Sequence, residues 1–130
     1  MAPDGLVTRT SKAGPTETMD RLVAAVTARG MAVMARIDHA AAAVKVGMDL
    51  RPTEVLIFGN PLAGAPLMQA AQTVGIDLPL RALVWQDEAG ATWVGYNDPK
   101  WLAARHGVAR QASLDAIGAA LAAVFAEAAA

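Results

Sequence analysis

The chain has 130 residues, enough for one domain that buries a core without disulfides or a structural metal. Its 11 basic and 12 acidic residues leave a formal net charge of -1, and no basic block is present that could follow a nucleic-acid backbone. Cysteine is absent, which excludes a disulfide framework, thiolate zinc sites and a cysteine nucleophile.

The first half of the chain has the pattern of two strands, each followed by a helix. Thr16 is placed to cap the first helix, because apolar residues then recur at the spacing of one helical face. Asp38 ends an alternating apolar and polar run and can cap the second helix. The expected elements are a polar edge strand at 6–12, a helix from Thr16 to Gly30, a strand at 31–38 and a short helix at 40–46.

The second half begins with a continuous apolar run. Residues 53–58 are rich in β-formers, which predicts a central strand covered on both faces. Pro66 suits the first position of the next helix, which Gly75 ends. The turn at 87–90 then joins two strands as a hairpin. The remaining expected elements are strands at 80–86 and 91–96, a helical segment from Asp98 to Gly107 and a last helix capped by Ser113.

This order of elements favours an α+β fold. The helices between Asp38 and Gly75 are too short for a doubly wound parallel sheet, and a hairpin comes late in the chain. We therefore expect a single domain over residues 1–130, with an antiparallel sheet and helices packed on one face.

The hydropathy of the chain comes largely from small residues. Hydrophobic residues make up 55% of the sequence, but 31 residues are alanines, so a mean hydropathy of +0.33 overstates membrane affinity. The uncharged run at 116–126 is shorter than the roughly 20 residues that a membrane span requires. The N-terminus lacks the regions of a secretory signal. We expect a soluble, cytoplasmic protein of bacterial type.

Several motifs occur in the order found in a known family. They are Ile37-Asp38-His39, the run from Arg51 to Pro61, Ala63-Gly64, Pro66-Leu67-Met68, Leu78-Pro79-Leu80 and Tyr96-Asn97-Asp98-Pro99. Over roughly residues 16–108 the chain resembles DUF302, a domain of unknown function. The resemblance implies a compact β-α-β(4)-α domain, often dimeric, without an agreed activity. Residues 113–129 are then a C-terminal helical extension.

The turn after the apolar strand is the first candidate site. Phe58 ends that strand, and Gly59 and Gly64 bracket a loop whose free amide groups could hold a carboxylate or phosphate. No Lys-Ser/Thr pair follows Gly64, so the loop is not a nucleotide-binding P-loop. The alternative is that the glycines only permit a tight turn, in which Asn60 satisfies local backbone groups.

His39 is the candidate for acid–base chemistry. It would come near Asn60 if strands 31–38 and 53–58 are neighbours in the sheet, since both lead into helices through comparable loops. The alternative is a histidine hydrogen-bonded at a helix terminus. His106, beside Gly107, is interpreted as a favourable cation at a helix C-terminus.

The aromatic residues supply the last candidate. Tyr96 and Trp85 could form, with Phe58, an apolar wall for a small ligand, or they could simply pack in the core. A metal site is not expected, because only two histidines are present and no metal-binding spacing occurs. A weak site of His39 with Asp38 or Glu54 stays open. No cofactor is predicted.

Two functions stay open. The preferred hypothesis is a homodimeric, non-enzymatic domain that binds a small ligand or a protein partner at a pocket near Asn60, with Gly59, Gly64, Phe58 and Tyr96. The alternative is a small enzyme in which His39 is the general acid or base. In that enzyme Asn60 and the helix-start amides would stabilise negative charge. Neither hypothesis involves nucleic acid or a membrane.

Overall fold

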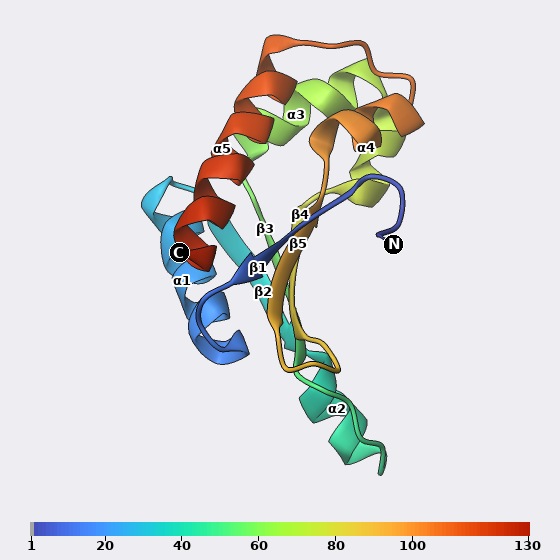
Figure 1. Ribbon diagram of the computed structural model, residues 1–130. Coiled ribbons are helices and arrows are strands. Elements are labelled where there is room, and N and C mark those ends of the chain that lie inside the picture. Colours follow the sequence, from blue (N-terminus) through green and yellow to red (C-terminus); the bar gives the residue numbers. More distant parts are fainter. Residues whose placement is uncertain (1) are drawn as a thin grey trace.

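Five strands form one antiparallel sheet in the structure, a computed structural model that describes residues 2–130 (Figure 1). Their order across the sheet is β1-β5-β4-β3-β2, and every neighbouring pair is antiparallel. The predicted α+β class is therefore confirmed. The strands are β1 (Leu6–Ser11), β2 (Ala32–Asp38), β3 (Thr53–Gly59), β4 (Leu80–Gln86) and β5 (Thr92–Asn97).

The helices occupy one face and the two ends of the sheet (Figure 1). Two long helices, α1 (Pro15–Ala28) and α5 (Ala112–Ala129), pack together and against the sheet. The short helix α2 (His39–Lys45) projects at one end of the molecule. Three short helices gather at the opposite end: α3 (Pro61–Ala70), the 3-10 helix η1 (Gln72–Asp77) and α4 (Pro99–Arg105).

The core lies between the sheet and the two long helices. Leu56 and Phe58 of β3 are fully buried on the side of the sheet that faces α1 and α5. By length and composition alone, α5 is the one helix within residues 2–130 that could cross a membrane. Its apolar stripe, however, is buried in the core of the domain. The buried residues of α5 are Leu114, Ile117, Leu121, Val124, Phe125, Ala128 and Ala129.

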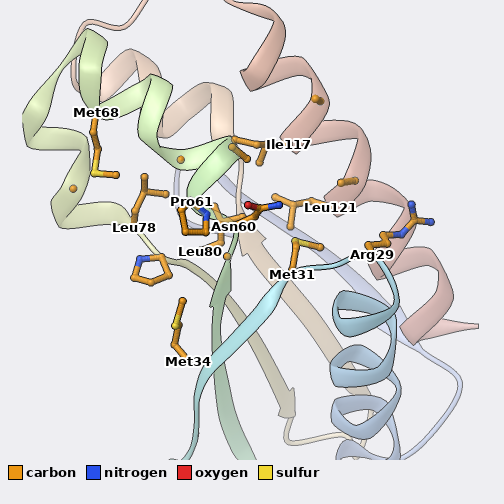
Figure 2. A pocket seen from close by; sticks show the side chains of 17 residues that line it. Arg29, Met31, Met34, Asn60, Pro61, Met68, Leu78, Leu80, Ile117 and Leu121 are labelled. Carbon is orange, nitrogen blue, oxygen red and sulfur yellow. The ribbon is translucent and has the colours of Figure 1, made fainter.

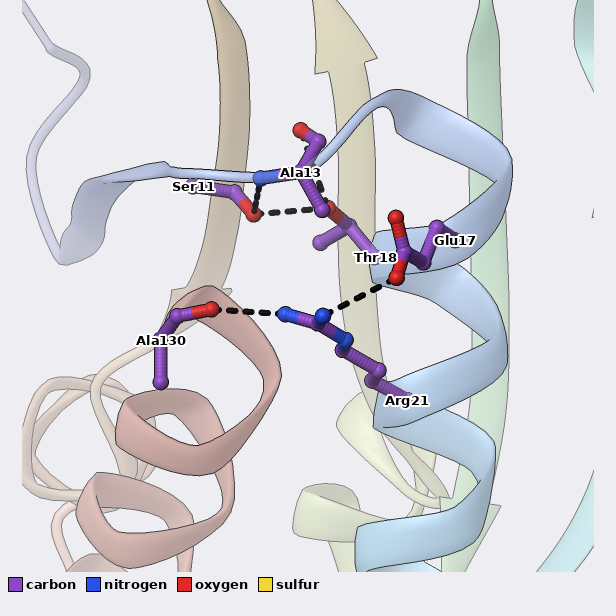
Figure 3. A network of polar contacts seen from close by, with 6 residues as sticks. All are labelled: Ser11, Ala13, Glu17, Thr18, Arg21 and Ala130. Atoms are coloured by element: carbon purple, nitrogen blue, oxygen red, sulfur yellow. Dashed lines mark hydrogen bonds and ion pairs between the residues drawn. The ribbon is translucent and has the colours of Figure 1, made fainter.

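Polar contacts join α1 to the C-terminal end of α5 (Figure 3). The Arg21 guanidinium of α1 donates to the Ala130 carbonyl oxygen at 2.6 Å and to Glu17 at 2.9 Å. Nearby, the hydroxyls of Ser11 and the fully buried Thr18 lie 2.6 Å apart. Since a buried hydroxyl without a partner is costly, this bond lets β1 enter α1 through a closely packed turn.

The predicted aspartate caps are confirmed. Asp38 accepts from the Ala41 N–H and Asp98 from the Lys100 N–H, each at 2.9 Å. The observed starts of two other helices differ from the predicted ones by one or two residues. Helix α1 begins at Pro15, with Gly14 rather than Thr16 as N-cap, because the fixed φ of proline suits the first position. Helix α5 begins at Ala112, one residue before the predicted cap Ser113.

The face of the sheet turned away from α1 and α5 is open. Strand β3 is interior, as predicted, but its covering on both faces is not observed, because Val55 and Ile57 are only half-buried. Trp85 and Trp93 stack across the hairpin on this face, with ring centroids 6.1 Å apart. We refer below to the open face, made by the side chains of Ile37, Val55, Ile57, Leu83, Trp85 and Trp93.

The predicted β4–β5 hairpin is confirmed, and its turn is held by a carboxylate. Asp87 accepts from the Trp93 indole N–H at 2.8 Å and from the Ala91 N–H at 2.9 Å. These bonds, the Trp93 bond first, lower the pKa of Asp87. Gly90 completes the turn at a φ of 85°, a conformation that glycine adopts without strain.

Candidate functional site

A largely apolar pocket of about 380 Å³ lies beside the turn from β3 to α3 (Figure 2). Its walls come from the start of β2, from α3, from η1 and from one side of α5. Three methionines line it, and only two of its side chains are polar, Arg29 and Asn60. The complete lining is Arg29, Met31, Met34, Gly59, Asn60, Pro61, Ala63, Gly64, Met68, Gly75, Leu78, Pro79, Leu80, Ala116, Ile117, Ala120 and Leu121.

An irregularity in β2 places Met34 at this pocket. Val33 pairs with Phe58 and Ala35 with the preceding residue of β3, so Met34 is an extra residue between them. Such a bulge turns a side chain away from the regular alternation of the strand. As a result Met34 is 54% exposed and lines the pocket. The simple alternation of side chains predicted for residues 31–38 is therefore interrupted at the bulge.

Asn60 is the N-cap of α3. Its Oδ1 accepts from the Leu62 N–H at 3.0 Å, and its backbone oxygen accepts from the N–H groups of Ala63 and Gly64, each at 3.0 Å. Pro61, at the first helical position, has no N–H. The first turn therefore offers no free amide to an anion. The interpretation of this loop as a tight turn is favoured over the phosphate or carboxylate cradle.

The start of α3 lies five residues before the predicted one. Asn60 followed by Pro61 combines a capping side chain with a proline at the first position, which is a complete start signal. Pro66 lies inside the helix. Gly75 belongs to η1 instead of ending α3, which stops at Ala70.

The Asn60 carboxamide keeps one group for a ligand. Because Oδ1 is bound to the Leu62 N–H, the other end of the amide is the Nδ2 donor. Within residues 2–130 this donor has no hydrogen-bond partner, and Figure 2 shows the Asn60 side chain in the middle of the lining residues. A polar donor therefore faces an apolar space.

Two glycines let the walls approach closely. A Cβ atom on Gly64 would lie 3.3 Å from Leu78 Cδ1, and one on Gly59 would lie 3.5 Å from Pro79 Cβ. The first distance is tighter than an ordinary van der Waals contact. Gly59 and Gly64 thus line the predicted site, together with Asn60.

His39 lies far from this pocket. Asp38, directly before it, pairs with Glu54 at the start of β3, whereas Asn60 follows the end of β3. The two strands are neighbours, as the hypothesis required, but they run antiparallel, so their following loops lie at opposite ends of the pair. A seven-residue strand separates them by about 20 Å. The structure does not bring His39 and Asn60 into one site.

The predicted aromatic wall is not formed either. Phe58 is fully buried in the core and does not line the pocket. Tyr96 packs on Phe125, with ring centroids 4.3 Å apart, and lines a separate cavity of about 330 Å³. Burial, followed by the nearby Asp98 carboxylate, raises the pKa of Tyr96. Trp85 points to the opposite face of the sheet.

A polar cluster near η1, built around the buried side chain of His106, was not predicted from the sequence. His106 Nε2 lies 2.6 Å from Asp77 Oδ2, and His106 Nδ1 lies 2.8 Å from the Thr73 hydroxyl. The His106 side chain is only 8% exposed. Arg105 Nη1 donates to both oxygens of Asp77, at 3.0 and 2.9 Å. No spacing in the sequence indicates this cluster, because its members are about thirty residues apart in the chain.

The structure offers no obvious metal site in the part of the chain that it describes. No group of three or more histidine, aspartate or glutamate side chains within residues 2–130 is arranged to hold an ion. His39 is exposed at the start of α2.

Comparison with known families decides the classification. Residues 7–128 match the family described as "Domain of unknown function DUF302". The chain belongs to the DUF302 family. The match includes α5, so it reaches beyond the range of 16–108 over which the motifs resembled the family.

A solved structure confirms the DUF302 fold. The crystal structure of an uncharacterized conserved DUF302 protein from Bacillus stearothermophilus superposes with a TM-score of 0.78. The alignment covers 98% of this chain and 97% of that chain, at 23% sequence identity. At this identity the likeness establishes the fold alone.

Curated relatives of this DUF302 chain are ion channels by name. The chain is 50% identical over 102 residues to fluoride-specific ion channel FluC 1 of Brucella suis biovar 1. It is equally similar to FluC 1 of Brucella abortus biovar 1. Each match covers 78% of this chain, but only 40% and 38% of the two relatives. The matched region is thus a minority of each channel protein.

Proposed function

We propose that this DUF302 chain is a binding domain whose pocket beside Asn60 takes a small, mostly apolar molecule. The observation that carries the proposal is an apolar cavity into which one free amide donor points. Its volume of about 380 Å³ falls within the range of about 300–1,000 Å³ usual for small-molecule pockets. The ligand would place a hydrogen-bond acceptor against Asn60 Nδ2.

The walls suit a ligand of variable shape. Met31, Met34 and Met68 have flexible, polarizable side chains that adapt to different apolar surfaces. Arg29 lies at the pocket and pairs with Glu127 at 3.1 Å, with both side chains more than a third exposed. Such a surface pair contributes about 0–1 kcal/mol, so an acidic group on the ligand can replace Glu127 at little cost.

The pocket favours binding over acid–base catalysis. Arg29 and Asn60 are its only polar side chains, and neither a guanidinium nor a carboxamide is among the usual general acids and bases. With His39 about 20 Å from Asn60, no candidate general base reaches the space. We therefore prefer the binding hypothesis to the enzyme.

Filling the pocket with a larger side chain tests the proposal, and the same change on the exposed surface of α5 is the control. Ala120→Leu puts a larger side chain into the cavity from α5, whereas Ala119→Leu puts the same side chain on its exposed surface. Both residue types are strong helix formers, so the helix should tolerate either change. We expect saturable binding of the fluorescent probe 8-anilinonaphthalene-1-sulfonate to wild type, unchanged affinity in Ala119→Leu and at least about tenfold weaker binding in Ala120→Leu.

The probe matches the proposed chemistry, because it joins an apolar ring system to one anionic group. Equal affinities of the two variants would refute the pocket as the binding site, as would a wild-type signal that does not saturate. Native mass spectrometry of the purified protein should also reveal a retained small molecule in wild type and its loss in Ala120→Leu.

We propose a second copy of the chain as the protein partner. The apolar stripe of α5 does not supply this contact, because it is buried in its own domain. Exposed apolar side chains occur instead on α2 and the loop after it. They are Val44, Val46, Met48 and Leu50, and the open face adds a further apolar surface.

The dimensions of the open face are adequate for a two-fold dimer. Five strands spaced about 4.8 Å apart and six residues long cover about 500 Å² in plan. A stable interface buries about 800 Å² on each partner, so the residues of α2 and its loop would supply the rest. Sheet-on-sheet packing of two open faces would also cover the stacked Trp85 and Trp93.

Light scattering on a sizing column tests the dimer. Wild type is expected to have the mass of two chains at micromolar concentration, and Ile57→Lys the mass of one, because a buried unpaired ammonium opposes association. Ala119→Lys, on the exposed surface of α5 and on the other side of the sheet, is the control and should remain dimeric. A monomeric wild type would contradict this proposal without affecting the pocket.

A further inference from the structure

Both polar side chains of the pocket beside Asn60 offer hydrogen-bond donors. The Arg29 guanidinium carries only N–H groups, and the free end of the Asn60 carboxamide is Nδ2, because Oδ1 is bound to the Leu62 N–H. No carboxylate, hydroxyl or imidazole side chain from residues 2–130 lines the space. The polar end of a ligand held here must therefore accept hydrogen bonds, and a negative charge on it suits the guanidinium.

These donors lie toward one end of the pocket, and apolar walls continue to the other end. Figure 2 shows Arg29 on the opposite side of the lining from Met34 and Met68. The Asn60 side chain extends from its turn toward the Arg29 side (Figure 2). The arrangement suits an amphipathic molecule, with a polar head on the Arg29 side and an apolar tail that extends toward the two methionines.

Helix α5 forms a long wall of the pocket and supplies a carboxylate to Arg29. Ala116 and Ala120 line the space one helical turn apart, and Glu127 lies two turns beyond Ala120 on the same face of the helix. At 1.5 Å per residue, about 16 Å separates Ala116 from Glu127 along the helix axis. Glu127 Oε1 accepts from Arg29 Nη2 at 3.1 Å. A carboxylate of the chain itself is thus bound to the only cation of the pocket lining.

We propose that the ligand of this pocket is an alkyl carboxylate, a medium-chain fatty acid. Its carboxylate would accept from Asn60 Nδ2 and from Arg29, whose long, partly exposed side chain can leave Glu127 for it. Its alkyl chain would lie between the methionines and the alanines of α5, because methionine side chains adapt to irregular apolar surfaces. This ligand class rests on the proposed function of the pocket as a binding site.

Titration calorimetry with octanoate and its uncharged counterpart 1-octanol tests the head group. Both are expected to bind wild type saturably. Arg29→Gln should weaken octanoate binding at least about threefold and leave 1-octanol binding unchanged, because only the carboxylate uses the guanidinium charge. Glu127→Gln should strengthen octanoate binding about threefold, because it removes the competing carboxylate. Arg110→Gln breaks an exposed ion pair outside the pocket and should change neither affinity.

The length of the alkyl chain gives a second readout. Each methylene that becomes buried strengthens binding about fourfold, so octanoate should bind about 15-fold more tightly than hexanoate. Arg29 and Glu127 are partly exposed, so the thermal unfolding midpoints of the two variants should stay close to that of wild type. This comparison separates a change in binding from a loss of folding.

Three results overturn the fatty acid as the ligand: no saturable heat with octanoate, octanoate affinity unchanged in Arg29→Gln, or equal affinities for hexanoate and octanoate. If 1-octanol binds wild type while any of these results is obtained, the pocket remains a binding site and only the alkyl carboxylate is excluded. If neither octanoate, 1-octanol nor 8-anilinonaphthalene-1-sulfonate binds wild type saturably, the proposed function fails together with the ligand class.

Discussion

Phe125→Ala is expected to lower the free energy of unfolding by about 3–5 kcal/mol, the usual cost of removing a buried phenylalanine. Phe125 is 1% exposed and packs against Tyr96, where α5 meets the sheet. The loss combines the burial of the ring with a cavity that rigid neighbours cannot close. Urea denaturation followed by circular dichroism measures it.

This substitution tests whether α5 is part of the domain core or an appendage to it. If α5 were an appendage to a DUF302 core at 16–108, removing one of its side chains would hardly change the stability of the rest. Glu127→Ala is the control on the same helix, because Glu127 makes only a surface ion pair and should cost less than about 1 kcal/mol. A loss of similar size for Phe125→Ala would contradict the position of α5 in the core.

Asp77→Ala should have the second largest effect, a loss of about 1–3 kcal/mol. The change leaves the His106 imidazole, 8% exposed, without the acceptor that now lies 2.6 Å from its Nε2. It also releases Arg105, which ties η1 to the end of α4. Unpaired polar groups in a poorly solvated position cost more than the lost bond alone contributes.

Two further variants separate the loss of the His106 acceptor from the loss of the Arg105 ion pair. Asp77→Asn keeps an oxygen that can accept from His106 and should lose less than Asp77→Ala. Arg105→Ala removes an exposed partner and should lose less than about 1 kcal/mol. Equal losses for Asp77→Ala and Arg105→Ala would show that the ion pair, and not the buried imidazole, carries the stabilisation.

Local signals predicted much of this fold. The strand at 80–86 was predicted with the observed ends, because β-formers are bounded by a proline and an acidic turn. Asp38 and Asp98 were identified as caps because capping depends only on the next few residues. At the β3–α3 turn, two prolines competed for one helix start, and the adjacent Asn60 decided for Pro61.

The candidate site could not be predicted from local sequence patterns, because it depends on how segments distant in the sequence pair and pack. His39 and Asn60 follow strands that do pair, but the direction of pairing places them at opposite ends. The bulge that turns Met34 into the pocket has no sequence mark, since it is defined by the partner strand. His106 was read as a helix-terminal cation because its partner Asp77 is distant in sequence.

Methionine methyl groups test the pocket beside Asn60 most directly. The chain has six methionines, and three of them, Met31, Met34 and Met68, line the pocket. Met19 is buried in the core, and Met48 is exposed after α2, so both serve as internal controls. The measurement is a ¹³C-methyl NMR titration with 8-anilinonaphthalene-1-sulfonate. We predict saturable shifts of the three pocket signals, with the signals of Met19 and Met48 unmoved. Shifts confined to Met48, or the absence of any saturable shift, would contradict a ligand site at this pocket.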